Sequence, residues 1–426
     1  MGLLSQVAGM SYCWKARSTK CGGAPFCQHI RREERSVSFH SPISPPQRLL
    51  RFVESRCSSS GSGREKRRSK LGQMKARQLV NVVMRRYGMG SSLYAVSRIK
   101  PEEQLFYPST KEAQASSTGE METISISRMP APSLRLELSV SKEDKRLDFL
   151  PFYERGSKIL CVDAEGRTVL YDTDAGLLHS MPCLGTPKGP NPVSSILDRE
   201  PRDPGRADAL YVMGRCCNYF DLEALMYCDP SSGRKGWRWH QLPPPPVPRA
   251  AASAVRCHAL IHDEGDPILV VSAKTSGVGT HCFNTSTNRW FKAGRWTLPF
   301  VGRAERVSEF DNLWFGIGGG WPYDLCAMDL YSLGAGAEAL GLAYSWGDLS
   351  LPDDWVMMDC SMVYLGGGRF CVAKIFEFRV GDDRLGMGAV ISGLEVVRRG
   401  EPSKLVMVKH KSKFYKFTRD EIECIL

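Results

Sequence analysis

The chain lacks any run of eighteen or more apolar residues, the length that a helix needs to cross a bilayer, so we expect no membrane-spanning helix. We also expect no secretory leader, because the opening residues, Met1-Gly-Leu-Leu-Ser-Gln6, contain no basic residue and no long apolar stretch. Its fifteen cysteines form no C-x-x-C pair. We therefore expect free thiols in a reducing compartment and no disulfide framework.

A net positive charge is missing from most of the chain. Residues 1–73 hold 14 Lys/Arg and 4 Asp/Glu, whereas the other 353 residues hold 43 basic and 42 acidic residues. The net charge of +11 therefore belongs almost wholly to the N-terminal tail. A nucleic-acid-binding domain should carry a basic excess on its folded body, so this class of function is disfavoured.

The basic tail, residues 1–73, is rich in Ser, Arg, Gly and Pro and shows no sustained periodicity, which predicts disorder. Three interpretations stay open. The first thirty residues contain no acid, as in a transit peptide for a mitochondrion or plastid. Lys66-Arg67-Arg68 fits a nuclear signal. The tail is alternatively a gene-model extension, with natural translation beginning near Met74. Without a transit peptide, we expect the protein in the cytoplasm or nucleus.

What the sequence does contain is a strand–turn pattern, most visible in residues 210–246. A β-rich run ends at Gly214, and a second apolar run ends at Asp229-Pro230. A Ser-Ser-Gly turn then leads to Trp237, Trp239 and a proline run. A unit this short cannot bury both faces of its own sheet, so it must pack against similar units.

The pattern recurs along the chain. Comparable strands end at four turn-forming residues, 57, 55 and 45 positions apart: Asp172, Asp229, Asn284 and Asp329. Further units are expected at 368–374 and 389–417. Such spacing is typical of propeller blades. We predict an all-β propeller of about six degenerate blades, with seven as the alternative, over residues 92–426. A short helix is predicted within residues 74–91.

Each repeat is expected to use the same residue types for the same purpose. An acid or amide at the end of a strand, such as Asp229 or Asn284, accepts hydrogen bonds from the following backbone and starts a turn. A tryptophan on the next strand buries a large area between blades. The tryptophans expected in this role are Trp237, Trp290, Trp314 and Trp346.

The units resemble the kelch repeat of β-propellers, and the best copies are residues 211–214 and 284–290. Over residues 74–426 the chain is similar to a narrower family of kelch-like proteins of unknown function, much expanded in grasses. The segments that carry this resemblance are 75–84, 105–110, 128–133, 298–305, 367–371 and 407–412. The resemblance implies a plant source and a propeller fold that begins near Met74. It implies no established activity and no catalytic residues.

Three sequence patterns resemble catalytic, metal-binding or phosphate-binding motifs, but a structural role is the preferred interpretation of each. Residues 343–347 approximate a nucleophile elbow around Ser345, but an elbow needs a strand-to-helix turn. Cys257-His258 with His262 would supply too few metal ligands. The glycines of 316–320 precede neither a helix nor a phosphate-binding lysine, so we expect a turn.

A basic segment with interleaved aromatics lies near the C-terminus. Its lysines Lys409, Lys411 and Lys413 are candidates for contacting an acidic partner or RNA. The preferred interpretation is a solvated edge strand whose lysines prevent pairing with other chains.

The repeat scaffold without a recognisable catalytic, cofactor or metal site predicts a non-enzymatic protein-interaction scaffold. We expect a monomer that binds another protein on the loop-lined face of the propeller. One rival is an oxidase or hydrolase with an unrecognised site at the mouth of the propeller channel. The other is a ubiquitin-ligase adaptor, which would need an F-box; residues 351–355 resemble only the opening of that module.

Overall fold

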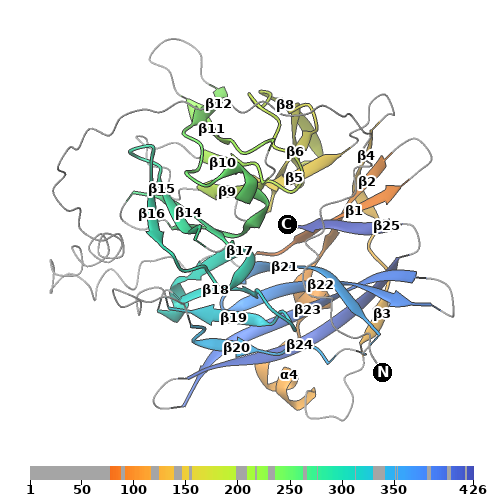
Figure 1. Ribbon diagram of the computed structural model, residues 1–426. Coiled ribbons are helices and arrows are strands. Elements are labelled where there is room, and N and C mark those ends of the chain that lie inside the picture. The colour runs from red at the N-terminus through yellow and green to blue at the C-terminus, as the bar shows by residue number, and fades with distance from the viewer. Residues whose placement is uncertain are drawn as a thin grey trace, which may run out of the picture. The chain divides into compact units, whose positions relative to one another are not determined.

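The computed structural model describes most of the chain beyond residue 76, and Figure 1 shows its elements. The described ranges are 77–87, 92–116, 124–138, 146–152, 156–197, 209–215, 218–228, 236–261, 266–275, 277–311, 313–329, 341–350, 352, 354–380, 385–400, 404–417 and 420–426. The predictions for residues 1–73, Asp229 and His262 fall outside these ranges. No helix within them is long and apolar enough to cross a membrane.

The described chain is all-β, and most of its strands belong to antiparallel meanders of four consecutive strands. One such sheet contains β5 (Leu147–Pro151), β6 (Lys158–Asp163), β7 (Thr168–Asp172) and β8 (Leu177–Met181). The next contains β9 (Val193–Leu197), β10 (Ala209–Met213), β11 (Leu222–Cys228) and β12 (Gly236–Leu242). The three strands predicted within residues 210–246 are therefore confirmed, whereas the turn predicted between β11 and β12 lies outside the described ranges.

Two further meanders are joined into one eight-stranded sheet. The first contains β13 (Val255–Ile261), β14 (Ile268–Ala273), β15 (Gly279–Asn284) and β16 (Arg289–Gly294). The second contains β17 (Phe300–Val307), β18 (Leu313–Gly318), β19 (Leu325–Met328) and β20 (Tyr344–Trp346). A short parallel pairing of Cys257 with Gly302 and of His258 with Arg303 links β13 to β17.

The remaining strands form two sheets. One contains β21 (Val356–Gly366), β22 (Arg369–Arg379), β23 (Leu385–Arg399) and β24 (Lys404–Phe417), with β3 (Ser125–Ser127) parallel to β24. The other contains β25 (Asp420–Ile425), β1 (Val80–Tyr87), β2 (Ser92–Ile99) and β4 (Pro132–Leu138). Strands from opposite ends of the described chain thus complete one sheet, where β25 pairs with β1 (Figure 1).

Apolar clusters connect these sheets in sequence order. Each meander shares a buried cluster with the meander that follows it, from the β5–β8 sheet to the β21–β24 sheet. The sheet that contains β25 and β1 shares one cluster with the β21–β24 sheet and another with the β5–β8 sheet. Strands such as β10 and β14 are buried throughout because sheets cover both of their faces, which explains their continuous apolar sequences.

Two sequence predictions are wrong. The helix expected within residues 74–91 is instead strand β1. Its valines are β-branched, and Val80, Val82 and Val83 are fully buried between neighbouring sheets, so packing and ladder pairing with β2 and β25 favour a strand. The separate units expected at 368–374 and 389–417 belong to one sheet, because β22 pairs with β23 over eleven residues.

The segment between β2 and β4 holds two short helices and a short strand. It forms α3 (Pro101–Gln104), α4 (Thr110–Ser116) and β3. The Thr110 hydroxyl donates a hydrogen bond to Glu395 of β23 at 2.8 Å. Two 3₁₀ turns, η1 (Arg249–Ala254) and η2 (Ser308–Phe310), precede β13 and follow β17.

Candidate functional site

A cleft of about 370 Å³ lies between the β13–β16 and β17–β20 meanders. Its lining comes from both meanders and from the loops between them. The lining residues are Arg256, Ser272, Lys274, Thr297, Leu298, Pro299, Phe300, Val301, Gly318, Gly319, Gly320, Trp321, Pro322, Asp324, Cys326, Leu342 and Ser345. The volume is in the range of small-ligand pockets, so the cleft has room for a few side chains and not for a folded domain.

Irregular strand pairing opens this cleft. In β13 the register with β14 shifts between Val255 and Cys257, which leaves Arg256 out of the ladder with an exposed side chain. In β17 the register with β18 shifts between Val301 and Glu305. Within that shift Gly302, with φ of +71°, pairs with β13 instead. Such bulges redirect side chains, and here they separate the two meanders beside the point where they join.

The loop between β16 and β17 is fixed to the wall formed by β14 and β15. The Thr280 hydroxyl donates to the Trp296 carbonyl at 2.8 Å, and Ser272 Oγ accepts the Leu298 N–H at 2.8 Å. These two hydroxyls also lie 2.9 Å apart and share a hydrogen bond. This wall is therefore held in place before any ligand arrives.

The opposite wall is the loop between β18 and β19. The Gly318 N–H donates to the Asp324 carbonyl at 2.9 Å, and the Gly319 N–H donates to the Pro299 carbonyl at 2.8 Å. The loop presents Trp321, whose exposed fraction is 65%. It also contains a cis bond between Trp321 and Pro322. A large aromatic side chain thus stands in solvent on a hydrogen-bonded loop.

Three charged side chains in the cleft have no hydrogen bond or ion pair within the described chain. Arg256 and Lys274 belong to the β13–β14 wall, and Asp324 belongs to the opposite wall. Burial raises the pKa of Asp324, the nearby Lys374 ammonium lowers it, and the Asp348 carboxylate raises it, with a net upward shift. These groups are available to a ligand.

A buried ion pair lies behind the Asp324 wall. Lys374 of β22 and Asp348, both about 1% exposed at the side chain, form a close ion pair. Lys374 Nζ also donates to the Pro322 carbonyl at 3.3 Å, so it supports the loop that carries Trp321. The second carboxylate oxygen of Asp348 is buried without a hydrogen-bond partner in the described chain. This pair is part of the framework, whereas the three side chains above face the cleft.

The nucleophile candidates in the cleft are poorly activated. Cys326 Sγ donates to Ser345 Oγ at 3.4 Å, and burial raises the pKa of the Cys326 thiol. A protonated thiol is a weak nucleophile. Ser345 lies within the short strand β20 and not at a strand-to-helix elbow, and the lining residues given above include no histidine to act as its base. The arrangement is suited to binding.

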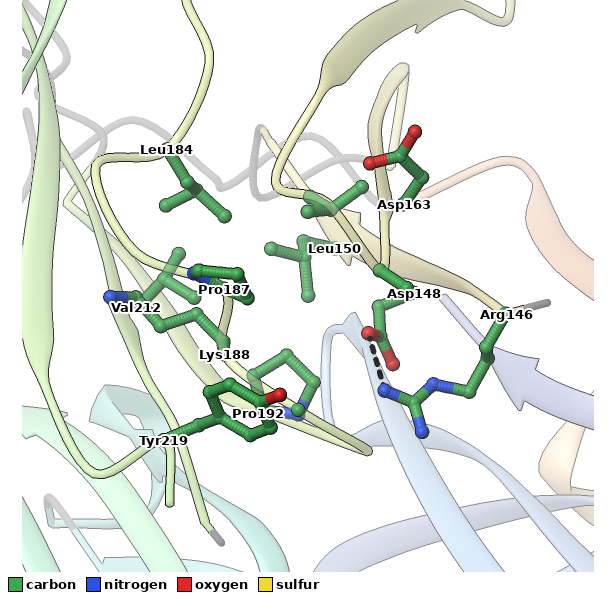
Figure 2. Close-up of a pocket in the computed structure, with 13 residues that line it drawn as sticks. Arg146, Asp148, Leu150, Asp163, Leu184, Pro187, Lys188, Pro192, Val212 and Tyr219 are labelled. Carbon is green, nitrogen blue, oxygen red and sulfur yellow. Dashed lines mark hydrogen bonds and ion pairs between the residues drawn. The ribbon is translucent and has the colours of Figure 1, made fainter. Parts of the chain in front are cut away.

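A second pocket, between the β5–β8 and β9–β12 sheets, is nearly filled. Its volume is about 10 Å³, room for about one water molecule. Figure 2 shows its lining, with an Arg146–Asp148 contact of 3.3 Å. Lys188, another lining residue, pairs with Glu223 at 2.6 Å, and both side chains are 2% exposed. We call this place the closed junction.

The four tryptophans predicted as wedges differ in burial. Trp314 is 2% exposed and lies in the cluster between the two meanders that flank the cleft. The others are half-buried against inter-sheet clusters: Trp237, Trp290 and Trp346. Trp290 also donates through Nε1 to the Pro243 carbonyl at 2.8 Å. Asn284 Oδ1 accepts the N–H groups of Ser286 and Thr287 at 3.0 and 2.8 Å, the geometry of a turn-forming residue.

The lysines predicted to face an acidic partner have contacts inside the chain. Lys409 Nζ donates to the Asp348 carbonyl, and Lys413 Nζ donates to Ser125 Oγ at 2.9 Å. Lys411 Nζ lies 4.8 Å from the centre of the Tyr107 ring. The expectation of a solvated edge strand is also corrected, because β3 covers part of β24 and these lysines are only half-exposed.

The remaining sequence patterns are structural. His258 is half-buried, its Nε2 lies 3.1 Å from the Ser194 carbonyl, and burial together with the charges of Arg303 and Arg215 lowers its pKa to about 3. Among the described residues, no group of three or more His, Cys, Asp or Glu is placed to hold a metal. The glycines of 316–320 end β18 and enter a turn, as predicted, and residues 351–355 precede strand β21.

Sequence reasoning missed the cleft residues Arg256, Lys274, Trp321 and Asp324. One local signal was present, since Trp321 follows three glycines and precedes a proline, which is unusual for a core tryptophan. The charged residues carry no such signal, because their exposure depends on register shifts between distant strands.

Comparisons with known proteins bear on family and not on activity. One similar solved structure is a protein of unknown function from Bacteroides thetaiotaomicron, 11% identical, with 71% of this chain and 68% of that chain covered and a TM-score of 0.32. Another is the N-terminal domain of Nup159, with 10% identity, 78% and 71% coverage and a TM-score of 0.16. A third belongs to the S. cerevisiae complex of Dbp5 with Nup159, Gle1, IP6 and ADP, with 8% identity, 81% coverage of each chain and a TM-score of 0.16.

TM-scores this low do not establish a shared fold, and a search of curated proteins found no match. The informative comparison is with a family model described as protein of unknown function (DUF1668). It matches residues 77–415, which covers most of the described strands. The chain therefore belongs to the DUF1668 family.

Proposed function

We propose that this chain is a non-enzymatic protein-interaction scaffold built as a kelch-like β-propeller of six blades, of the plant type that its sequence resembles. Six four-stranded units and the buried clusters between consecutive units support the blade number. The pairing of β25 with β1 supports a ring closed by strands from both ends of the fold.

The partner docks in the cleft between the β13–β16 and β17–β20 meanders. The observation that carries this proposal is the set of unpaired charges, Arg256, Lys274 and Asp324, beside the exposed Trp321 on a hydrogen-bonded frame. Tryptophan and arginine are enriched among residues that dominate binding energy at protein interfaces. A frame that is already ordered lowers the entropy cost of association.

Proximity labelling in plant cells tests the proposal. The full chain and its Trp321→Ala variant are each fused to the labelling enzyme, and Lys111→Glu, an exposed site on α4, serves as the control. We expect a set of partner proteins that the control retains and Trp321→Ala loses. Identical partner sets for the full chain and Trp321→Ala would contradict docking in the cleft.

A further inference from the structure

The charges around the cleft are unevenly distributed. Lys374 and Asp348 form a close buried pair and offset each other. Arg256 and Lys274 remain on the β13–β14 wall, with no carboxylate beside them among the lining residues of that wall. Asp324 stands on the opposite wall. An anionic group is therefore attracted to one side of the cleft and repelled from the other.

The same cleft offers an apolar surface at its edge. Trp321 is 65% exposed and Leu342 is 41% exposed, and both are lining residues. An ideal Cβ added to Gly320 would meet no atom within 4 Å, so the chain leaves space beside the tryptophan. A ligand that reached Arg256 and Lys274 would have an aromatic face within the same pocket to contact with an apolar group.

We propose that the cleft binds an extended peptide segment whose acidic side chain pairs with Arg256 and Lys274 while a nearby apolar side chain packs on Trp321. This inference rests on the proposed function and names the chemistry of its partner. A guanidinium and an ammonium together provide directional, charge-assisted hydrogen bonds to a carboxylate. An indole face provides a large apolar contact area.

Asp324 limits the charge that the site can neutralise. Together with Arg256 and Lys274 it leaves the lining with one net positive charge, which a single carboxylate balances. A phosphate group carries nearly twice the charge of a carboxylate, so it would leave excess negative charge facing Asp324. A nucleic-acid strand brings a phosphate at every residue and leaves a larger excess. The charge balance thus favours an acidic peptide over a phosphopeptide or RNA.

A displayed library of random twelve-residue peptides tests this chemistry on the full chain. We expect the enriched peptides to carry Asp or Glu within a few positions of an aromatic or aliphatic residue. A synthetic enriched peptide, measured by fluorescence polarisation, should bind Arg256→Glu/Lys274→Glu and Trp321→Ala at least about tenfold more weakly. Lys111→Glu should bind it unchanged. Asp324→Asn should improve binding of the same peptide with phosphoserine in place of the acidic residue.

Three results would overturn the inference. The first is enrichment of peptides without acidic residues, or of none. The second is equal binding by the Arg256→Glu/Lys274→Glu variant with an unchanged thermal midpoint. The third is tighter binding of a single-stranded RNA probe than of the peptide. If the peptide inference fails while Trp321→Ala still loses its labelled partners, the docking site stands and only the partner chemistry is wrong.

Discussion

The closed junction and the open cleft are built from equivalent parts of the chain. At the closed junction, the loop that leads into β9 lies over the end of β10 and beside the β5–β8 meander. At the cleft, the loop that leads into β17 lies over the end of β18 and beside the β13–β16 meander. Yet one space measures about 10 Å³ and the other about 370 Å³. The same architecture therefore either fills this position or leaves it open, and the two places differ in loop length and in the pairing of their charges.

Loop length is the first difference. Residues 182–192 connect β8 to β9 at the closed junction, whereas residues 295–299 connect β16 to β17 beside the cleft. The longer loop folds into the space and brings Lys188 to Glu223. The shorter loop crosses directly, fixed to the preceding wall by neutral hydrogen bonds, and leaves the space empty.

The treatment of charge is the second difference. At the closed junction Glu223 accepts the N–H groups of Gly185 and Thr186, at 2.9 and 3.0 Å, as well as the Lys188 ammonium. In the cleft, Arg256 and Lys274 have no partner within the described chain. Charges satisfied internally hold a loop in place, whereas charges left unsatisfied in a preformed cleft indicate a binding site.

The largest effect is expected where the two flanking meanders are packed behind the cleft. Trp314→Ala removes a side chain that is 2% exposed, and we expect it to lower the free energy of unfolding by about 3–5 kcal/mol, since it leaves a large cavity. Urea titration measures this loss. Trp321→Ala, at 65% exposure, is the control and should change stability by less than about 0.5 kcal/mol. If Trp314→Ala and Trp321→Ala lowered the free energy of unfolding equally, the cleft would be a general packing defect and not a local opening.

Lys188→Met tests the closed junction directly. The substitution leaves Glu223 buried without its cation, so we expect a loss of about 3 kcal/mol in the free energy of unfolding. The same substitution at Lys274, an exposed cleft lysine, should cost less than about 0.5 kcal/mol. Urea titration of both variants gives the comparison. Similar losses in the free energy of unfolding for the two variants would contradict the idea that Lys188 stabilises the fold whereas Lys274 is left for a ligand.

The pH dependence of the closed junction follows from Glu223. Burial alone would raise the pKa of Glu223, but Lys188, the Gly185 and Thr186 amides and the Thr186 hydroxyl hold it below its ordinary value of 4.5. A carboxyl whose pKa is lowered by folding stabilises the fold above its unfolded pKa, and this contribution is lost as pH falls through the folded value. Glu223→Gln should therefore cost about 2 kcal/mol at pH 7.

The stability gap between wild type and Glu223→Gln should shrink once the pH falls below about 4.5 toward the lowered folded pKa. Thermal unfolding of both proteins from pH 7 down to pH 3 measures the gap. A gap that stayed constant over this range would mean that the carboxylate charge is not what closes the junction.

Sequence alone predicted the repeated strands well and the cleft not at all. The strands of 210–246 and the turn at Asn284 follow from local signals, namely buried apolar runs and a side chain that bonds its own backbone. Strand β1 was missed because Val80, Val82 and Val83 lie next to helix-forming residues, and the pairing with β2 and with the distant β25 shows that they form a strand.

The cleft depends on non-local register. Arg256 faces it because β13 shifts register against β14, and Gly302 leaves the β17–β18 ladder to pair with β13. Neither shift leaves a pattern in the adjacent residues. Turn-forming residues and the periodicity of apolar residues are local signals that a sequence shows directly. A bulge that links two meanders depends instead on how both meanders pack against each other.

The smallest effect is expected for a matched pair of arginines. Arg146 at the closed junction contacts Asp148 at 3.3 Å, so Arg146→Gln should lower the free energy of unfolding by about 1 kcal/mol. Arg256 in the cleft has no such contact within the described chain, and Arg256→Gln should lie within about 0.5 kcal/mol of wild type. Urea titration resolves the difference when both variants are measured in parallel. A cost at Arg256 as large as that at Arg146 would mean that its charge supports the fold and is not reserved for a ligand.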